Sequence, residues 1–287
     1  MITLKSWPNG QDFCFMNTPG KVYRLLNVLS LDVALGAVCC AAWFATGFQV
    51  QLRPYAYLAL GLTVWIIYTA DHLLDASKIT REASTYRHRF HQKYFKTLLT
   101  IVLLAVIVDF TLLFFIRLKI LYAGLGLFSI VILYLLVNRW LSFAKEIVIA
   151  LVYSCGVLLP AFSLKQTSLS MSDVWWVASF FLTTLINLIL FSIYDAHSDQ
   201  ADGSNSFVLT FGEVFTRKIL NGFFILQAVL IGTLVYEAML PVSVVLFLMN
   251  ATLLVLFLNQ PFFRQFDRYR LYGDVIFLFP VVLLYVG

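Results

Sequence analysis

Long apolar runs separated by short polar segments dominate the chain. A helix needs roughly 20 apolar residues to cross about 30 Å of hydrocarbon. The runs are continuously apolar rather than alternating, which favours helices over the strands of a membrane barrel. Nine runs are present, and the fifth is short: 25–48, 55–74, 97–115, 120–137, 147–162, 174–194, 219–236, 242–258 and 271–286. The pattern predicts an all-α integral membrane protein with nine transmembrane helices.

The composition agrees with a membrane location. The chain is 61% hydrophobic and 12% charged, with a mean hydropathy of +0.87, which is outside the range of soluble globular domains. We expect residues 1–24 to form a short cytoplasmic lead, with nothing that marks it for cleavage, and residues 25–287 to form one transmembrane domain. The four cysteines form no Cys-x-x-Cys pair, and we interpret them as packing residues.

The distribution of Lys and Arg predicts the orientation. If the N-terminus is inside, sixteen of the twenty basic residues lie on the inner side, as the positive-inside rule requires. The polar ends of the second and sixth runs then face the cytoplasm, and we expect the cell (inner) membrane as the location. This topology, together with attraction to anionic membrane lipids, accounts for the formal charge of +5, so no nucleic acid is expected as a partner.

Two aspartate pairs, Asp71/Asp75 and Asp195/Asp199, lie at the ends of the second and sixth runs. Each pair has the i, i+4 spacing that places two side chains on one helix face, and the pairs are 124 residues apart. Carboxylates at the edge of hydrocarbon are costly unless they are compensated. Mg²⁺ prefers oxygen ligands and commonly joins one or two carboxylates to substrate phosphates. We therefore predict that these four residues bind Mg²⁺ and a diphosphate, with Asp202 on the adjoining turn assisting.

Basic residues follow the first pair and also lie between the fourth and fifth runs. They could grip a bound diphosphate, or they could only serve the positive-inside rule, and the sequence leaves both interpretations open. The candidates are Lys78, Arg81, Arg87, Arg89, Arg139 and Lys145. His72 and His197 neighbour motif aspartates, but so acidic a set favours a hard cation, so we predict structural roles for the histidines.

The two motifs resemble those of the UbiA superfamily of intramembrane prenyltransferases. The stronger match is Asp195-x-x-x-Asp199-x-x-x-Gly203, whereas the first motif is partial, because Ile67 and Tyr68 replace a leading Asn-Asp. Two weaker similarities are the segment around Asp32 and Gly36, near the start of the first run, and the segment 134–139, in which Asn138 replaces a lysine. These departures are typical of a divergent member.

The resemblance implies a nine-helix bundle that transfers a prenyl group from an isoprenyl diphosphate to an aromatic, lipid-soluble acceptor, with a quinone precursor as our first expectation. It implies Mg²⁺ as the cofactor and Asp71, Asp75, Asp195 and Asp199 as the catalytic, metal-binding residues. The substrate-binding candidates are Asp32, Tyr194, Asp202 and the six basic residues named above.

Other functions are also compatible with the sequence. A non-catalytic isoprenoid-binding homologue is one, because half of the first motif is missing. A cation-coupled transporter is another, although its acids should lie near the membrane midplane rather than at helix ends. A CDP-alcohol phosphotransferase is disfavoured, because Asp202-Gly203 is not followed by that family's pattern.

Overall fold

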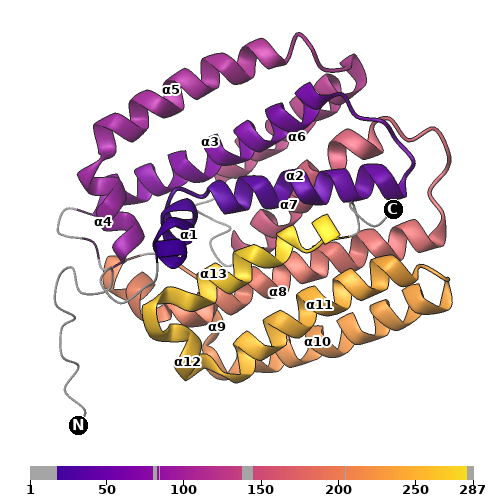
Figure 1. Ribbon diagram of the computed structural model, residues 1–287. Coiled ribbons are helices and arrows are strands. Elements are labelled where there is room, and N and C mark those ends of the chain that lie inside the picture. The colour runs from indigo at the N-terminus through magenta and orange to yellow at the C-terminus, as the bar shows by residue number, and fades with distance from the viewer. Residues whose placement is uncertain (1–17, 80–82, 84, 138–144, 204, 283–287) are drawn as a thin grey trace.

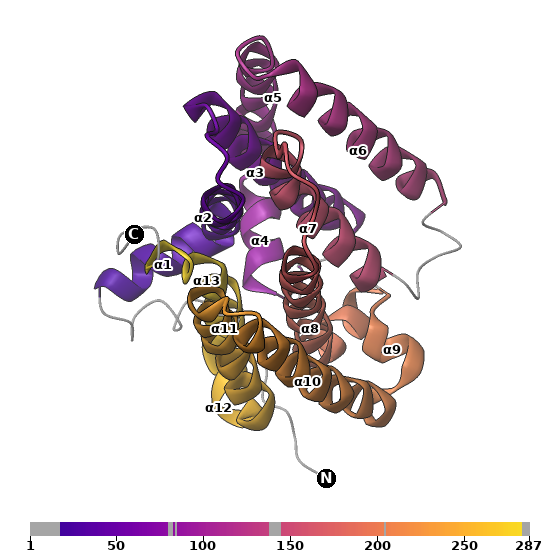
Figure 2. The same ribbon diagram turned by 90° about the vertical axis from the view of Figure 1, so that its right-hand side faces the viewer.

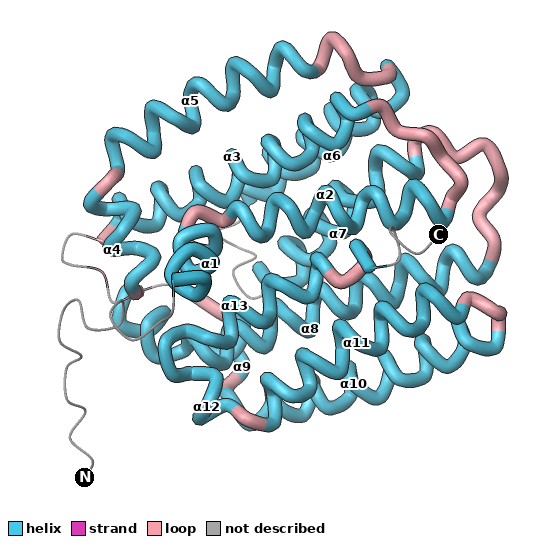
Figure 3. The backbone as a smooth tube through the Cα atoms, viewed as in Figure 1, coloured by secondary structure: helices cyan, strands magenta, loops and turns pink. Residues whose placement is uncertain are grey.

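The computed structural model describes the chain except for residues 1–17, 80–82, 84, 138–144, 204 and 283–287 (Figure 1). All regular structure in the described part is helical, which confirms the all-α prediction (Figure 3). The long helices lie side by side as an elongated bundle, so each buries one face against its neighbours and turns another outward.

Six helices of the described chain are long and apolar enough to cross a membrane. They are α3 (Pro54–Lys78), α5 (Phe95–Leu112), α7 (Lys145–Phe162), α8 (Met171–Asp202), α10 (Glu213–Tyr236) and α11 (Leu240–Leu258). The pair α1 (Thr18–Val28) and α2 (Leu31–Gly47) makes a seventh if a bent pair counts as one span, and α6 (Leu118–Val137) is apolar over a shorter stretch. The structure therefore supports a multi-pass membrane protein, with six or seven of the nine predicted spans.

The sequence predicts one helix over the first apolar run, but the structure has two helices there. Helices α1 and α2 meet at 81°, and Ser30 between them has a left-handed backbone with φ of 56°. A left-handed residue ends a helix because it turns the next carbonyl off the axis. The polar side chains of Asn27 and Asp32 flank this bend and are buried together, so the break serves a polar contact that apolarity alone does not predict.

The last apolar run also differs from its prediction. The helix α13 (Arg268–Val275) starts in the preceding polar segment and gives way to a short 3₁₀ helix, Ile276–Leu278. Pro280 follows, and its missing N–H cannot continue an α-helical ladder. In the described part of the ninth predicted span, residues 271–275 belong to α13 and residues 276–278 to the 3₁₀ helix, while residues 283–286 lie outside the described residues, so this span stays a prediction.

The helix α8 forms the centre of the bundle. In its most apolar stretch 72% of the residues are buried, compared with 11% in α5. Trp176 of α8 stacks on Phe44 of α2 with ring centroids 4.5 Å apart, and Phe180 meets the same ring edge-on at 5.2 Å. Helix α5 lies at the edge of the bundle (Figure 2), and most of its apolar side chains are exposed, which suits contact with lipid chains.

The short helices gather at one end of the bundle. They are α1, α4 (Tyr86–Lys93), α9 (Phe207–Phe211) and α12 (Gln260–Arg264), and α13 begins there too (Figures 1 and 3). Both α3 and α8 end at this same end, whereas the loops after α2, α5, α7 and α10 lie at the other. The fold therefore brings the two aspartate motifs to one end of the bundle.

Candidate functional site

The first motif lies in the last two turns of α3. Asp71 is exposed and has no ion pair within 4 Å among the described residues, whereas Asp75 is half-buried. Nζ of Lys78 lies 3.0 Å from the Asp75 carboxylate, but the Lys78 side chain is 72% exposed. An exposed i, i+3 pair of this kind adds little stability and leaves both groups free to exchange partners. The first motif thus presents accessible carboxylates.

The second motif occupies the corresponding position on α8. Asp195 is seven residues before the end of α8, just as Asp71 is seven residues before the end of α3. Asp199 is half-buried and has no basic group within salt-bridge distance in the described part of the chain. Lys145, the first residue of α7, lies close enough to act electrostatically on both Asp71 and Asp199. The two motifs therefore share one basic neighbour.

Asp195 differs from the other motif aspartates because α13 binds both of its oxygens. Nη2 of Arg270 lies 2.7 Å from Oδ2, and the Tyr269 hydroxyl donates to Oδ1. The Tyr269 ring also stacks on Tyr194, the residue before Asp195, with centroids 4.3 Å apart and nearly parallel planes. The Tyr194 hydroxyl donates to the backbone carbonyl of Leu256 at 2.6 Å, so this predicted substrate-binding residue is held in place and supports the Tyr269 ring. We call the contacts of Tyr269 and Arg270 with Asp195 the clamp.

Helix α4 covers the ends of both motif helices. His88 of α4 lies 3.7 Å from Asp202 of α8, whose side chain is only 3% exposed, and it is also within electrostatic range of Asp75 of α3. Thr85 caps α4 by accepting from the His88 N–H at 3.3 Å. One short helix therefore connects the two motifs.

A buried polar network anchors α4 to the bundle. Arg87 donates to the side-chain oxygen of Asn27 at 2.9 Å and to its backbone carbonyl at 3.2 Å, and Nη1 lies 3.3 Å from His72. The Asn27 amide in turn donates to Asp32 at 2.5 Å and to Asp274 at 2.9 Å. Buried charges persist only when they are paired and hydrogen-bonded, and here one asparagine links a guanidinium to two carboxylates.

Two predicted substrate-binding residues, Asp32 and Arg87, belong to this network. Both residues hydrogen-bond the side chain of Asn27 and not the exposed carboxylate of Asp71. Arg89 donates to the carbonyl of Ala83 at 3.1 Å, within the segment that leads into α4. Arg81 and Arg139 lie outside the described residues. The substrate-binding roles of these five residues stay predictions.

Burial governs the histidines of α4. Burial, followed by the positive charge of Arg270, lowers the pKa of His88, and burial also lowers the pKa of His91. Both shifts favour the neutral form of the ring.

Sequence reasoning did not find Asn27, Tyr269, Arg270 or Asp274 as parts of this region. Arg270 had counted only toward the positive-inside tally, and Asp274 falls within the last apolar run. The one available signal was a carboxylate inside an apolar run, because such a group requires a partner. Nothing in a single sequence indicates that this partner lies some 247 positions away, as Asn27 does.

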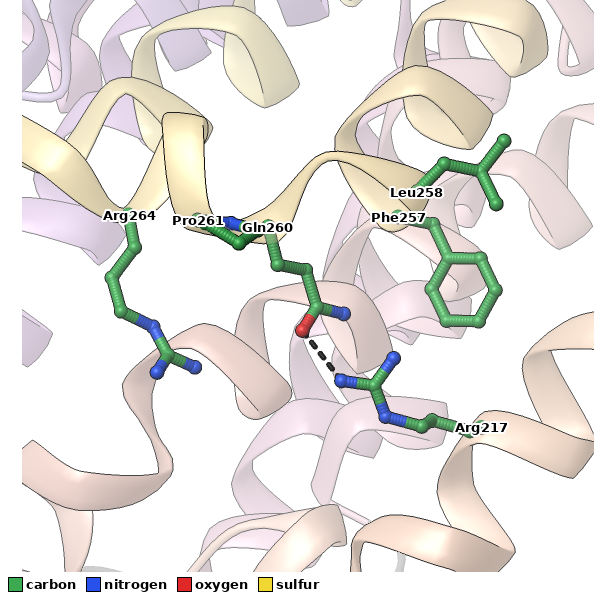
Figure 4. A pocket seen from close by; sticks show the side chains of 6 residues that line it. All are labelled: Arg217, Phe257, Leu258, Gln260, Pro261 and Arg264. Atoms are coloured by element: carbon green, nitrogen blue, oxygen red, sulfur yellow. Dashed lines mark hydrogen bonds between the residues drawn. The ribbon is translucent and has the colours of Figure 1, made fainter.

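A pocket of about 390 Å³ lies where α10, α11 and α12 meet (Figure 4). It is lined by Arg217, Arg264, Gln260, Phe257, Leu258 and Pro261. Arg217 donates to Gln260 at 2.6 Å and to Glu213 at 2.7 Å. None of the residues predicted from the sequence lines this pocket.

The donor set at the motif end fits Mg²⁺. No group of three His, Cys, Asp or Glu side chains in the described chain forms a ready-made metal cage. Mg²⁺ does not require one, because it keeps several waters and needs only one or two protein carboxylates beside substrate phosphates. Asp71, Asp75 and Asp199 supply carboxylate oxygens with no strong long-range partner.

Comparison with known proteins identifies the fold. No family model and no curated protein sequence matches the chain. Among solved structures, the chain is similar to a UbiA homolog from Archaeoglobus fulgidus bound to DMAPP and Mg²⁺. The TM-score is 0.60 at 15% identity, and the match covers 91% of this chain and 99% of that one. The chain therefore has the UbiA fold, and the resemblance drawn from the aspartate motifs is confirmed at the level of fold.

Proposed function

We propose that this protein transfers a prenyl group from an isoprenyl diphosphate to an aromatic, lipid-soluble acceptor, in a reaction that requires Mg²⁺. The observation that carries the proposal is the placement of two aspartate motifs at the same end of a bundle with the UbiA fold, next to a histidine- and arginine-bearing helix. The structural neighbour was bound to an isoprenyl diphosphate and Mg²⁺, which is the pair of ligands that such an acidic site suits.

The chemistry follows from charge development. As the allylic C–O bond breaks, its electron pair leaves with pyrophosphate, and positive charge grows on the allylic carbon. A ring carbon of the acceptor then bonds to that carbon and loses its proton to solvent or pyrophosphate. Bound Mg²⁺ would neutralise charge on the leaving diphosphate, and metal ions placed at developing charge are among the largest catalytic contributions.

Different residues of the chain have different roles in this proposed reaction. Asp71, Asp75 and Asp199 would hold the cation, and Lys145, which lies close to both motifs, would supply a counter-charge for the diphosphate. Residues of α4 lie next to both motifs, where they would shield part of the allylic cation from water. The isoprenoid tail lies among the apolar side chains of the bundle, and the motif end faces the cytoplasm in our proposed topology.

The depth of the aspartates favours an enzyme over a cation-coupled transporter. Asp71 and Asp195 are each seven residues from the end of their helix, or about 10 Å at 1.5 Å per residue. A transport site near the midplane of a membrane would lie deeper than this.

The test is prenyl transfer by the purified protein with DMAPP and a panel of aromatic acceptors, with and without EDTA. We expect turnover in Mg²⁺, none in EDTA, a strong loss in Asp71→Ala and a smaller loss in Asp195→Ala. Arg268→Gln is the control, because that guanidinium lies over the rings of Phe262 and Phe266 and contacts no motif aspartate. Undiminished turnover in both aspartate variants would reject the site, and binding of DMAPP without turnover on any acceptor would favour a non-catalytic homologue.

A further inference from the structure

The carboxylate of Asp195 is matched by a cation from its own chain. Arg270 contacts one oxygen at 2.7 Å and the Tyr269 hydroxyl contacts the other, while Nε of Arg270 donates to that same hydroxyl at 3.0 Å. The side chains of Asp195 and Arg270 are 12% and 21% exposed, so solvent screens the pair only weakly. The three groups close a ring of contacts in which each charge is compensated.

The backbone before α13 is shaped to produce this contact. Phe266 and Asp267 both have left-handed conformations, with φ of 57° and 54°. A bulky residue rarely adopts this region, and strained backbones persist only where the surroundings hold them, frequently at functional sites. The two residues turn the chain from α12 into α13.

A glycine then lets α13 approach α8 closely. A Cβ at Gly273 would lie 2.4 Å from the ring of Phe191 and 2.8 Å from the side-chain oxygen of Asn187, so no other residue fits without a shift. Arg270 is one turn before Gly273, and Asp195 is one turn after Phe191. The close approach at Gly273 therefore also sets Arg270 against Asp195.

We propose that Arg270 is the resident cation of the second motif. On this view Asp195 binds a guanidinium where the sequence predicts a divalent ion, and the metal is held by Asp71, Asp75 and Asp199. This inference deepens the proposed function and rests on it. A guanidinium suits the role because its planar set of donors matches a carboxylate. A metal that captured Asp195 would take from this largely enclosed guanidinium the carboxylate that it hydrogen-bonds, which is unfavourable.

The first motif has no equivalent of this clamp. The ion pair of Asp75 is local and exposed, and Asp71 has none within 4 Å among the described residues. Among the described residues, Asp195 is therefore the motif aspartate whose charge is balanced by a clamp from another helix. We expect metal binding to depend more on the first motif than on Asp195.

The test counts Mn²⁺ ions bound by the purified full-length protein in the presence of inorganic pyrophosphate, by electron paramagnetic resonance. The variants are Asp75→Asn, Asp195→Asn, Arg270→Gln and the double variant Asp195→Asn/Arg270→Gln. Arg268→Gln is the matched control, because that guanidinium lies over the rings of Phe262 and Phe266 rather than on a carboxylate.

We expect Asp75→Asn to weaken Mn²⁺ binding by about tenfold or more, and Asp195→Asn to change it less than about threefold. Arg270→Gln should gain one ion per chain, the double variant should lose that gain, and Arg268→Gln should match the wild type. Equal losses in Asp75→Asn and Asp195→Asn, or no gained ion in Arg270→Gln, would overturn the inference. If Arg270→Gln does not fold, the comparison of Asp75→Asn with Asp195→Asn decides. A wild type that binds no Mn²⁺ counts against the proposed function, whereas the gained ion tests Arg270 separately.

Discussion

The two aspartate motifs look alike in sequence but are supported in different ways. The first motif, on α3, presents the exposed carboxylate of Asp71 and the half-buried one of Asp75 near α4, which the Asn27–Arg87 contact anchors to the bundle. The second motif, on α8, is clamped directly by Tyr269 and Arg270 of α13. Identical spacing therefore yields one accessible pair and one pair that is partly neutralised from within. The spacing of a motif therefore determines where its carboxylates lie, whereas contacts from distant segments determine what those carboxylates can bind.

The largest expected effect separates the two motifs by activity. Asp71→Asn removes an accessible carboxylate, so we expect prenyl transfer to fall roughly 100- to 1,000-fold, in the range seen when one group that stabilises the transition state is lost. Asp195→Asn acts by loosening the clamp and should cost only about tenfold. Steady-state kinetics with DMAPP and Mg²⁺ measures both, and equal losses would remove the distinction between the motifs.

The anchor of α4 over the first motif depends on Asn27. Asn27→Ala leaves the buried Arg87 and Asp32 without their shared partner, and each unsatisfied group costs about 1–3 kcal/mol. We therefore expect a loss of roughly 3 kcal/mol in the free energy of unfolding. Unfolding in detergent, followed by tryptophan fluorescence, measures it. Asn259→Ala is the control, because that exposed amide bonds only its own helix. A similar loss in both variants would show that the network gives no special support.

The clamp on the second motif depends on Gly273. Gly273→Ala forces a methyl group into Phe191, and overpacking of this kind costs about 1–3 kcal/mol. Because the shift also moves Arg270 from Asp195, we expect activity to fall together with stability. Gly222→Ala is the control, because its methyl group would meet nothing within 4 Å. Unchanged activity in Gly273→Ala would show that the clamp tolerates displacement.

The smallest effect concerns the dependence on pH of the stability of α4, the helix next to both motifs. Burial lowers the pKa of both His88 and His91, so the folded state binds fewer protons than a state in which α4 is detached. The stability of α4 is therefore complete above about pH 6.5 and declines as the pH falls, by about 1.4 kcal/mol for each unit by which a pKa is lowered. Hydrogen exchange of α4 at pH 7.5 and 5.5, corrected for intrinsic rates, should show weaker protection at the lower pH. Protection that is equal at both values would contradict this assignment, and His91→Gln should reduce the difference.

Much of the fold was predictable because apolar runs and aspartate spacing are local signals. The helices α3, α8, α10 and α11 fall where the hydropathy pattern places them, and the motifs lie at one end of the bundle. The bend at Ser30 was not predictable, because a left-handed serine inside an apolar run leaves no pattern. The start of α13 was similarly hidden, since this helix begins among charged residues.

The candidate site was predictable in its acids but not in their partners. Asp71, Asp75, Asp195 and Asp199 were found from their spacing, whereas Arg270 lies 75 residues from the carboxylate it binds. Arginine before an apolar run has an ordinary topological explanation, so its second role is visible only when α13 packs on α8. Contacts of this range depend on packing, as the requirement for glycine at position 273 illustrates.

The most direct test is to locate the metal. Crystals of the full chain with Mn²⁺ and DMAPP, measured at a wavelength where manganese scatters anomalously, would place every bound ion. We expect a peak at the shared end of α3 and α8, coordinated by Asp71, Asp75 or Asp199, with Arg270 still on Asp195. The absence of any peak at this end would contradict the proposed function, and a peak coordinated by Asp195 would contradict the role of Arg270.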